Sequence, residues 1–97
     1  MDVQFEKNGV TFVWDLRKSA INSNKHGISF EQATAAFFDP FLKLVDASRN
    51  GQSRDAILGY DDEGRLLFVV HLDVENDFIR LISARKATTA ERNHYDF

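Results

Sequence analysis

The stretch RLLFVVHLDVENDFIRLISAR, residues 65–85, decides the fold class that this sequence predicts. It contains two apolar runs, Arg65–Leu72 and Phe78–Arg85, whose length and content of Val, Ile, Leu and Phe are typical of β-strands. Only the polar connection DVEND separates them, and so short a connection joins antiparallel strands. The run before them, Arg54–Tyr60, is joined to the first by the turn DDEG in the same way. The sequence therefore predicts a meander of antiparallel strands.

Helices are predicted before and after this meander in the sequence, from the residues that mark helix ends. The first begins after Asp15, a residue that caps helices, and stops at Gly27. Two later helices begin at the capping boxes S-x-x-Q at 29–32 and T-x-x-E at 88–91, and the earlier of them ends near 39–40 at Asp-Pro. The apolar residues of this second helix recur at helical spacing and are expected in the core: Phe30, Ala33, Phe37 and Phe38.

The order of these elements predicts an α+β fold. Two further short strands, Thr11–Trp14 and Leu42–Asp46, complete the set. We expect an antiparallel four- to five-stranded sheet with two N-terminal helices and a C-terminal helix, in one domain of residues 1–97. The helices are expected on one face of the sheet, so the other face is free for a site.

The composition excludes several classes of protein. A hydrophobic fraction of 43% with nine Phe is typical of an ordinary folded domain. There is no Cys, which excludes a disulfide framework, a thiolate nucleophile and a Cys-based zinc site. No signal-peptide pattern and no apolar run of about 20 residues is present, so we expect a cytoplasmic protein without a membrane partner.

The net charge of −3 is unevenly distributed along the chain. Residues 55–77 contain seven acidic residues and only Arg65 as a base, whereas residues 16–30 contain three basic residues and no acid. Residues 80–94 contain four basic residues against Glu91. A solvated face is the simpler interpretation of each basic segment, and a basic site requires that the segments meet in space.

The last predicted strand contains most of the candidate cations. Its alternation places Arg80 and Lys86 on one face and Arg85 on the other, unless the strand bends or ends before Arg85. His71 lies near the end of the preceding strand, where a lone His is more often structural than catalytic. The sequence leaves open which of these side chains meet.

A phosphate site is the chemistry that these residue types favour. Four cations are candidates for it: Arg54, Arg80, Arg85 and Lys86. Cleavage of RNA also requires a group that moves the proton of the 2′-hydroxyl, which His71 or His26 could provide. The three His lack metal-ligand spacing, and no Gly-rich phosphate loop or G-x-S-x-G motif is present, so no metal or cofactor is expected.

Several motifs resemble those of the BrnT toxin family. They are, in order, FVWDLRK at 12–18, NSNKHGISFEQA at 22–33, DP at 39–40, VVH at 69–71 and IRLISARKATTAERNHY at 79–95. Together they extend over nearly the whole chain after Gly9. The sequence departs from the family pattern at Val13 and Ser53, where members usually have acidic residues.

The resemblance implies a toxin of a bacterial type II toxin-antitoxin pair with a fold similar to that of RelE-type toxins. Such toxins are ribonucleases that inhibit translation by cutting RNA. Their partner is BrnA, a small antitoxin whose DNA-binding part is of the ribbon-helix-helix type. The complex of the two represses its own promoter, so promoter DNA is expected as a partner only through the antitoxin.

The resemblance also implies the residues of the site. The expected catalytic set is Arg54, His71, Arg80, Arg85 and Lys86. In it the arginines hold the phosphate, the lysine adds charge and the histidine transfers the proton. The residues expected along the RNA path are Lys25, His26, Trp14 and Tyr95. The last two are ambiguous, because Trp14 also suits the core and the helix of Tyr95 also suits an antitoxin contact.

Two other interpretations remain open. In one, the basic corner binds phosphate or an acidic peptide and no bond is cut. In the other, the cations pair with acids on neighbouring strands and only stabilise the sheet.

Overall fold

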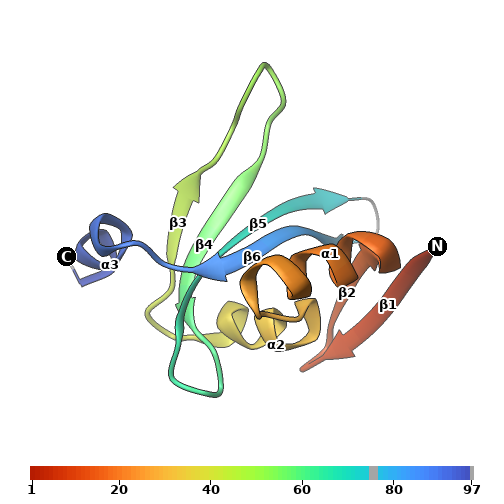
Figure 1. Ribbon diagram of the computed structural model, residues 1–97, viewed down its shortest axis with the longest axis horizontal. Helices are drawn as coiled ribbons and strands as arrows, with labels where there is room; N and C mark the ends of the chain where they lie inside the picture. The colour runs from red at the N-terminus through yellow and green to blue at the C-terminus, as the bar shows by residue number, and fades with distance from the viewer. Residues whose placement is uncertain (75–76, 97) are drawn as a thin grey trace.

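The computed structural model describes residues 1–74 and 77–96, which form a mixed sheet with helices around it (Figure 1). The elements follow the chain as β1 (Asp2–Lys7), β2 (Val10–Asp15), α1 (Leu16–His26), α2 (Phe30–Thr34), the 3₁₀ helix η1 (Ala35–Phe38), β3 (Lys43–Asp46), β4 (Asp55–Tyr60), β5 (Leu66–Val74), β6 (Phe78–Lys86) and α3 (Thr89–Asp96). In space the strands lie in the order β1-β2-β6-β5-β4-β3. The sheet therefore brings the last strand of the chain next to its second.

The α+β class with three α-helices is confirmed, but three features of the predicted fold are wrong. The sheet has six strands rather than four to five, and α1 and α2 follow two strands. It is also not purely antiparallel, because β2 runs parallel to β6, with Phe12 opposite Ile79 and Val13 opposite Arg80. All other neighbouring strands are antiparallel, including the predicted meander of β4, β5 and β6.

Strand β1 escaped prediction because none of its side chains is fully buried. Its half-buried Val3 and Phe5 alternate with exposed polar residues, which is a weak signal at the edge of a sheet. The stronger signal is the loop Asn8-Gly9, whose φ angles of 52° and 81° form the two-residue turn that hairpins favour. Asn-Gly between alternating residues was therefore the signal from which this hairpin could have been predicted.

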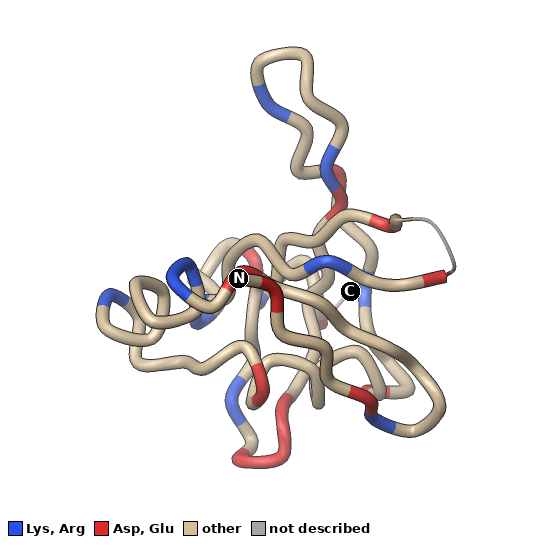
Figure 2. Tube along the Cα trace, turned by 90° about the vertical axis from the view of Figure 1, so that its right-hand side faces the viewer, with Lys and Arg blue, Asp and Glu red and all other residues tan. Residues whose placement is uncertain are grey.

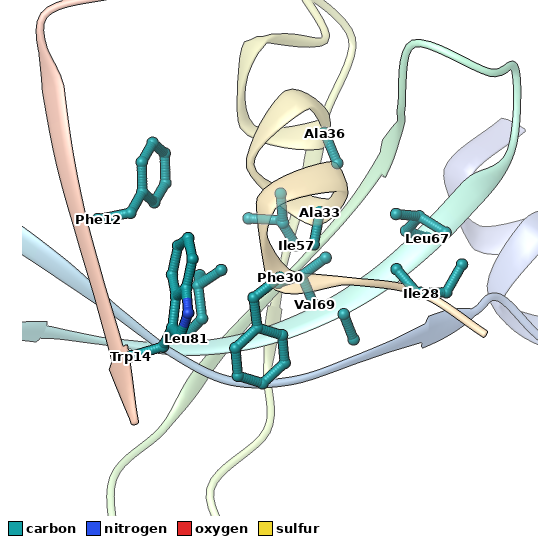
Figure 3. Packing of buried hydrophobic residues seen from close by; sticks show 11 residues of the cluster. Phe12, Trp14, Ile28, Phe30, Ala33, Ala36, Ile57, Leu67, Val69 and Leu81 are labelled. Atoms are coloured by element: carbon teal, nitrogen blue, oxygen red, sulfur yellow. The ribbon is translucent and has the colours of Figure 1, made fainter. Parts of the chain in front are cut away.

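The core lies between the sheet and the segment formed by α2 and η1 (Figure 3). Phe12 of β2 packs edge-on against Phe37, with 5.2 Å between the ring centroids, and Trp14 packs against Phe30 at 6.0 Å. Phe30 is fully buried and Phe37 packs against the same cluster, as their helical spacing predicted. One face of the sheet is thereby covered.

The predicted starts of the three helices and the predicted end of α1 are also confirmed, whereas the second helix changes from α to 3₁₀ after Thr34 and ends at Phe38. The side chain of Asp15 accepts a hydrogen bond from the amide of Lys18 at 3.0 Å, and Gly27 ends α1 at a φ of 70°. Both capping boxes, at 29–32 and at 88–91, form with reciprocal hydrogen bonds. In the described part of the chain, no helix combines the length and the apolar character that crossing a membrane requires.

Helix α1 is attached to the sheet through one buried polar side chain. Asn22 is 6% exposed, and its amide donates to the carbonyl oxygens of Ala84 at 2.9 Å and Ile28 at 3.1 Å. Its Oδ1 accepts a hydrogen bond from the amide of Ala84 at 3.1 Å. Because the register pairs β2 with β6 only near the start of β6, Asn22 satisfies the backbone of β6 beyond that point. This contact places the C-terminal end of α1 beside the end of β6.

Replacing Asn22 with alanine is expected to lower the free energy of unfolding by about 3 kcal/mol, because three buried backbone groups lose their partner. The measurement is urea unfolding of the wild type and of Asn22→Ala. Ser23→Ala, an exposed position on the same helix, is the control and is expected to stay within about 0.5 kcal/mol of wild type. A loss below about 1 kcal/mol for Asn22→Ala would show that α1 is held in another way.

Candidate functional site

A groove of about 640 Å³ lies over the first half of β5 and the end of β6. Its floor comes from these strands, one wall from the hairpin between β3 and β4, and the other wall from the C-terminal end of α1. The lining residues are Lys25, His26, Asp46, Ala47, Ser48, Arg49, Arg54, Phe68, Val70, Ser83, Arg85 and Glu91. Figure 2 shows the hairpin projecting from the body with basic positions along it. Four of these residues are Lys or Arg and two are acidic, so the groove is basic in an acidic protein.

A β-bulge in β6 decides which side chains face the groove. Val70 of β5 is opposite Ser83, but the next residue, His71, is opposite Leu81, so β6 contains one extra residue, Ile82. Such an insertion reverses the alternation of all the side chains that follow it. Residues of β6 that regular alternation would place on the same face therefore lie on opposite faces when Ile82 stands between them.

The bulge changes the predicted arrangement of the cations. Regular alternation along β6 predicts that Arg85 lies on the face opposite to Arg80, unless the strand bends. The bulge is such an irregularity, and it changes the face on which Arg85 lies. Arg85 is opposite Phe68, on the same face as Arg80, whereas Lys86 is opposite Leu67 on the core face and is exposed at the strand end. The predicted pair of Arg80 and Lys86 on one face is thus wrong.

Arg85 has the most defined surroundings of the basic residues in the groove. Its guanidinium carbon lies 4.4 Å from the centre of the Phe68 ring. Its Nη1 and Nη2 donate to the two carboxylate oxygens of Glu91 at 2.7 and 2.9 Å. These hydrogen bonds hold the pKa of Glu91 below its usual range and raise that of Arg85, so both groups are charged near neutral pH.

Arg54, Lys25 and His26 reach the same groove from other segments. Arg54 immediately precedes β4, and its Nη2 donates to Oε1 of Gln52 at 3.0 Å. Lys25 and His26 occupy the last turn of α1, which Asn22 fixes against β6. The structure therefore brings together four of the nine predicted site residues: Lys25, His26, Arg54 and Arg85.

Arg80 lies away from the groove. It forms two hydrogen bonds with the carboxylate of Asp2 in β1, at 2.7 and 3.3 Å, and these lower the pKa of Asp2. Arg80 is opposite Leu72 and Arg85 is opposite Phe68, so the two positions are four residue steps apart along β5, roughly 13 Å. Arg80 connects β1 to β6 across β2, and the described contacts give it no part in the groove.

His71 lies on the core face of the sheet. It is 5% exposed and packs edge-on against Phe37, with 5.1 Å between the ring centroids. Its Nδ1 has no hydrogen-bond partner among residues 1–74 and 77–96. The thickness of the sheet separates His71 from Arg85, so the structure does not bring the predicted proton-transfer group to the predicted phosphate site.

The two predicted aromatic contacts also lie outside the groove. Trp14 is 5% exposed and packs in the core, so its ring offers no open face to a base. Tyr95 donates a hydrogen bond of 2.6 Å to Asp39, and its ring packs edge-on against Tyr60 at 5.4 Å. Partial burial and this hydrogen bond raise the pKa of Tyr95 to about 12, so its hydroxyl remains a donor. Tyr95 anchors α3 to the body of the protein.

Sequence reasoning missed several residues of the groove, chiefly Arg49, Phe68 and Glu91. Arg49 precedes the pair Asn50-Gly51, whose φ angles of 52° and 75° form a second tight turn, and this Asn-Gly pair was the available signal. Phe68 could be found only once the register of β5 and β6 is known. Glu91 was interpreted only as part of a capping box.

The groove combines groups that bind phosphate with an imidazole, the side chain that most often serves in general acid-base catalysis. Arg54 and Arg85 offer guanidinium groups for phosphate oxygens, and His26 offers an imidazole. Among residues 1–74 and 77–96, no three His, Asp or Glu side chains form a group that could hold a metal ion. The groups present therefore suit chemistry on a phosphodiester.

Comparisons with known proteins point to one family. The chain is similar in structure to the ribonuclease toxin BrnT of Brucella abortus, with a TM-score of 0.57 and 23% sequence identity over 78% of this chain and 94% of that one. At this identity the likeness shows a shared fold. No curated protein matches the sequence at a significant level. The model of the family described as "Ribonuclease toxin, BrnT, of type II toxin-antitoxin system" matches residues 14–91, which is most of the chain, and the chain therefore belongs to the BrnT family.

Proposed function

We propose that this chain is a ribonuclease toxin that cuts RNA without a metal ion, inhibits translation in the cytoplasm and is neutralised by its antitoxin. The observation that supports this most is the groove in which Arg54, Arg85 and His26 meet from three separate segments. Cations stabilise the charge that develops on a phosphodiester during cleavage, and an imidazole can transfer the proton. RNA rather than DNA is the substrate, because its 2′-hydroxyl supplies the nucleophile.

The proposed reaction begins with the ribose 2′-hydroxyl. Its oxygen attacks the adjacent phosphorus and loses its proton, the bond from phosphorus to the 5′ oxygen breaks, and that oxygen takes up a proton. The products are a 2′,3′-cyclic phosphate and a 5′-hydroxyl end. Arg85 and Arg54 bind the non-bridging oxygens, where negative charge increases in the transition state, and His26 is the proton-transfer group.

The partner of a type II toxin is an antitoxin, and we propose one of the BrnA type with a ribbon-helix-helix part. The basic groove suits an acidic segment of such a partner, because that segment would occupy the place of the RNA backbone. Contact with promoter DNA then comes from the antitoxin.

The test is to incubate the purified chain with end-labelled RNA in excess EDTA. Fragments with 2′,3′-cyclic phosphate ends are the expected result, together with growth arrest when the chain is produced in bacteria without an antitoxin. Binding of RNA without fragments would favour the non-catalytic binding module instead. Cleavage that appears only after addition of Mg²⁺ would refute metal independence.

A further inference from the structure

The guanidinium of Arg85 is held by a single carboxylate in an end-on arrangement. Its Nη1 donates to Oε1 of Glu91 at 2.7 Å and its Nη2 to Oε2 at 2.9 Å. Nη1 also donates to the carbonyl oxygen of Lys86 at 3.2 Å. The guanidinium carbon lies over the ring of Phe68, 4.4 Å from its centroid. The head group is therefore fixed both in its plane and from one side.

The remaining donors of Arg85 form a second fork. Arginine has five N–H groups, and the contacts with Glu91 and Lys86 use three of them. The two that remain are the Nε–H and the second N–H of Nη2, which lie side by side on one edge of the guanidinium. No acceptor for them occurs among residues 1–74 and 77–96, and Arg85 lines the groove. Such an edge fits two oxygens of one phosphate.

Glu91 is itself fixed to the body of the protein. Its Oε1 also accepts a hydrogen bond from the amide of Thr88 at 2.8 Å, which closes the capping box of α3. Farther along α3, Tyr95 donates to Asp39 at 2.6 Å and Arg92 donates to the hydroxyl of Tyr60 at 3.1 Å. No side chain of α3 is buried, so these polar contacts set its position. The backbone amide of Thr88, together with the contacts of Arg92 and Tyr95, therefore sets the place of the Glu91 carboxylate and through it that of Arg85.

We propose that Glu91 is a positioning residue for cleavage, which holds Arg85 by its end-on fork so that the Nε and Nη2 edge binds the scissile phosphate. This proposal rests on the proposed ribonuclease function and assigns Glu91 a part in it. A competing role for Glu91 predicts the opposite change in RNA affinity. If Glu91 merely occupied the phosphate position, its removal would free Arg85 and strengthen RNA binding.

The experiment is a double-mutant cycle of Glu91→Gln and Arg85→Ala. Two quantities are measured: the single-turnover cleavage rate, and the affinity for the same RNA with a 2′-deoxyribose at the cleaved position, which binds but cannot be cut. The glutamine of Glu91→Gln has one oxygen instead of two, so only one of the two hydrogen bonds from Arg85 can remain. We expect the cleavage rate of this variant to fall about tenfold, since small misplacements of groups at the reacting centre are costly. Its affinity should fall as well. In the Arg85→Ala background, the same substitution should change neither quantity.

Thr88→Ala is the matched control at the same helix end. It removes the hydroxyl that accepts from the amide of Glu91 at 3.2 Å and leaves the Arg85–Glu91 pair in place. We expect a lower melting temperature for Thr88→Ala and an unchanged cleavage rate. Loss of activity in this control would assign the effect of Glu91 to the stability of α3 and overturn the proposal.

Two further results would overturn it: tighter RNA binding or faster cleavage by Glu91→Gln, and an effect of Glu91→Gln that persists in the Arg85→Ala background. A wild type that binds the deoxy-substituted RNA but cuts no RNA would refute the ribonuclease function. The affinity cycle would then still decide whether Glu91 positions Arg85.

Discussion

Arg85→Ala is expected to slow single-turnover cleavage of RNA by about 10²- to 10³-fold, the usual cost of removing one donor that stabilises charge in a transition state. Within residues 1–74 and 77–96, Arg85 has two unpaired donors on its Nε and Nη2 edge, lies over the ring of Phe68 and forms two hydrogen bonds with the carboxylate of Glu91. No other basic side chain of the groove has comparable surroundings among the described residues. Production of the variant in bacteria should no longer arrest growth, and melting curves should show that it remains folded.

Arg80→Ala is the control for this prediction, because both arginines lie on β6 and face the same side of the sheet. Arg80 is paired with Asp2 and lies outside the groove. Its replacement is expected to leave the cleavage rate within about threefold of wild type, as for a residue that makes no contact with the transition state. The loss in stability should be small, since exposed ion pairs contribute little. Equal loss of activity in both variants would return Arg80 to the catalytic set.

The elements of the fold that local patterns encode were predictable. Asp15, Gly27 and the two capping boxes marked the helix ends because each end has unpaired backbone groups that a nearby side chain can satisfy. The edge strand β1 was less visible, because a strand without fully buried residues has no strong apolar alternation. The parallel pairing of β2 with β6 depends on contacts between segments more than sixty residues apart, and no local pattern records it.

The site was predictable only in part for the same reason. Residue type and basic charge were enough to select Arg54, Arg85, Lys25 and His26. They could not show that Ile82 is an extra residue in β6, and this bulge puts Arg85 on the face of the groove. The side on which a strand residue points depends on every residue between it and the turn. One unrecognised bulge is therefore enough to change the composition of a predicted site.

His26→Gln is expected to slow cleavage by about 10²- to 10⁴-fold, the usual contribution of general acid-base catalysis. His26 is the histidine that lines the groove, and glutamine retains polar contacts there but cannot carry a proton between groups. RNA affinity should change little, since binding depends mainly on the arginines and Lys25. The measurement is the single-turnover rate with saturating enzyme, and binding of uncleavable RNA is followed in parallel.

His71→Gln tests which histidine transfers the proton, because the sequence predicted His71 and the proposal names His26. His71 is buried against Phe37 on the opposite face, so its replacement should lower the melting temperature and leave the cleavage rate of the folded protein close to that of wild type. A substrate with a 5′-thio leaving group then distinguishes the roles of His26, because sulfur departs without a proton. Rescue of His26→Gln by this substrate indicates the general acid, and no rescue indicates the base. If His71→Gln instead loses the activity and His26→Gln retains it, the proton transfer does not occur in this groove.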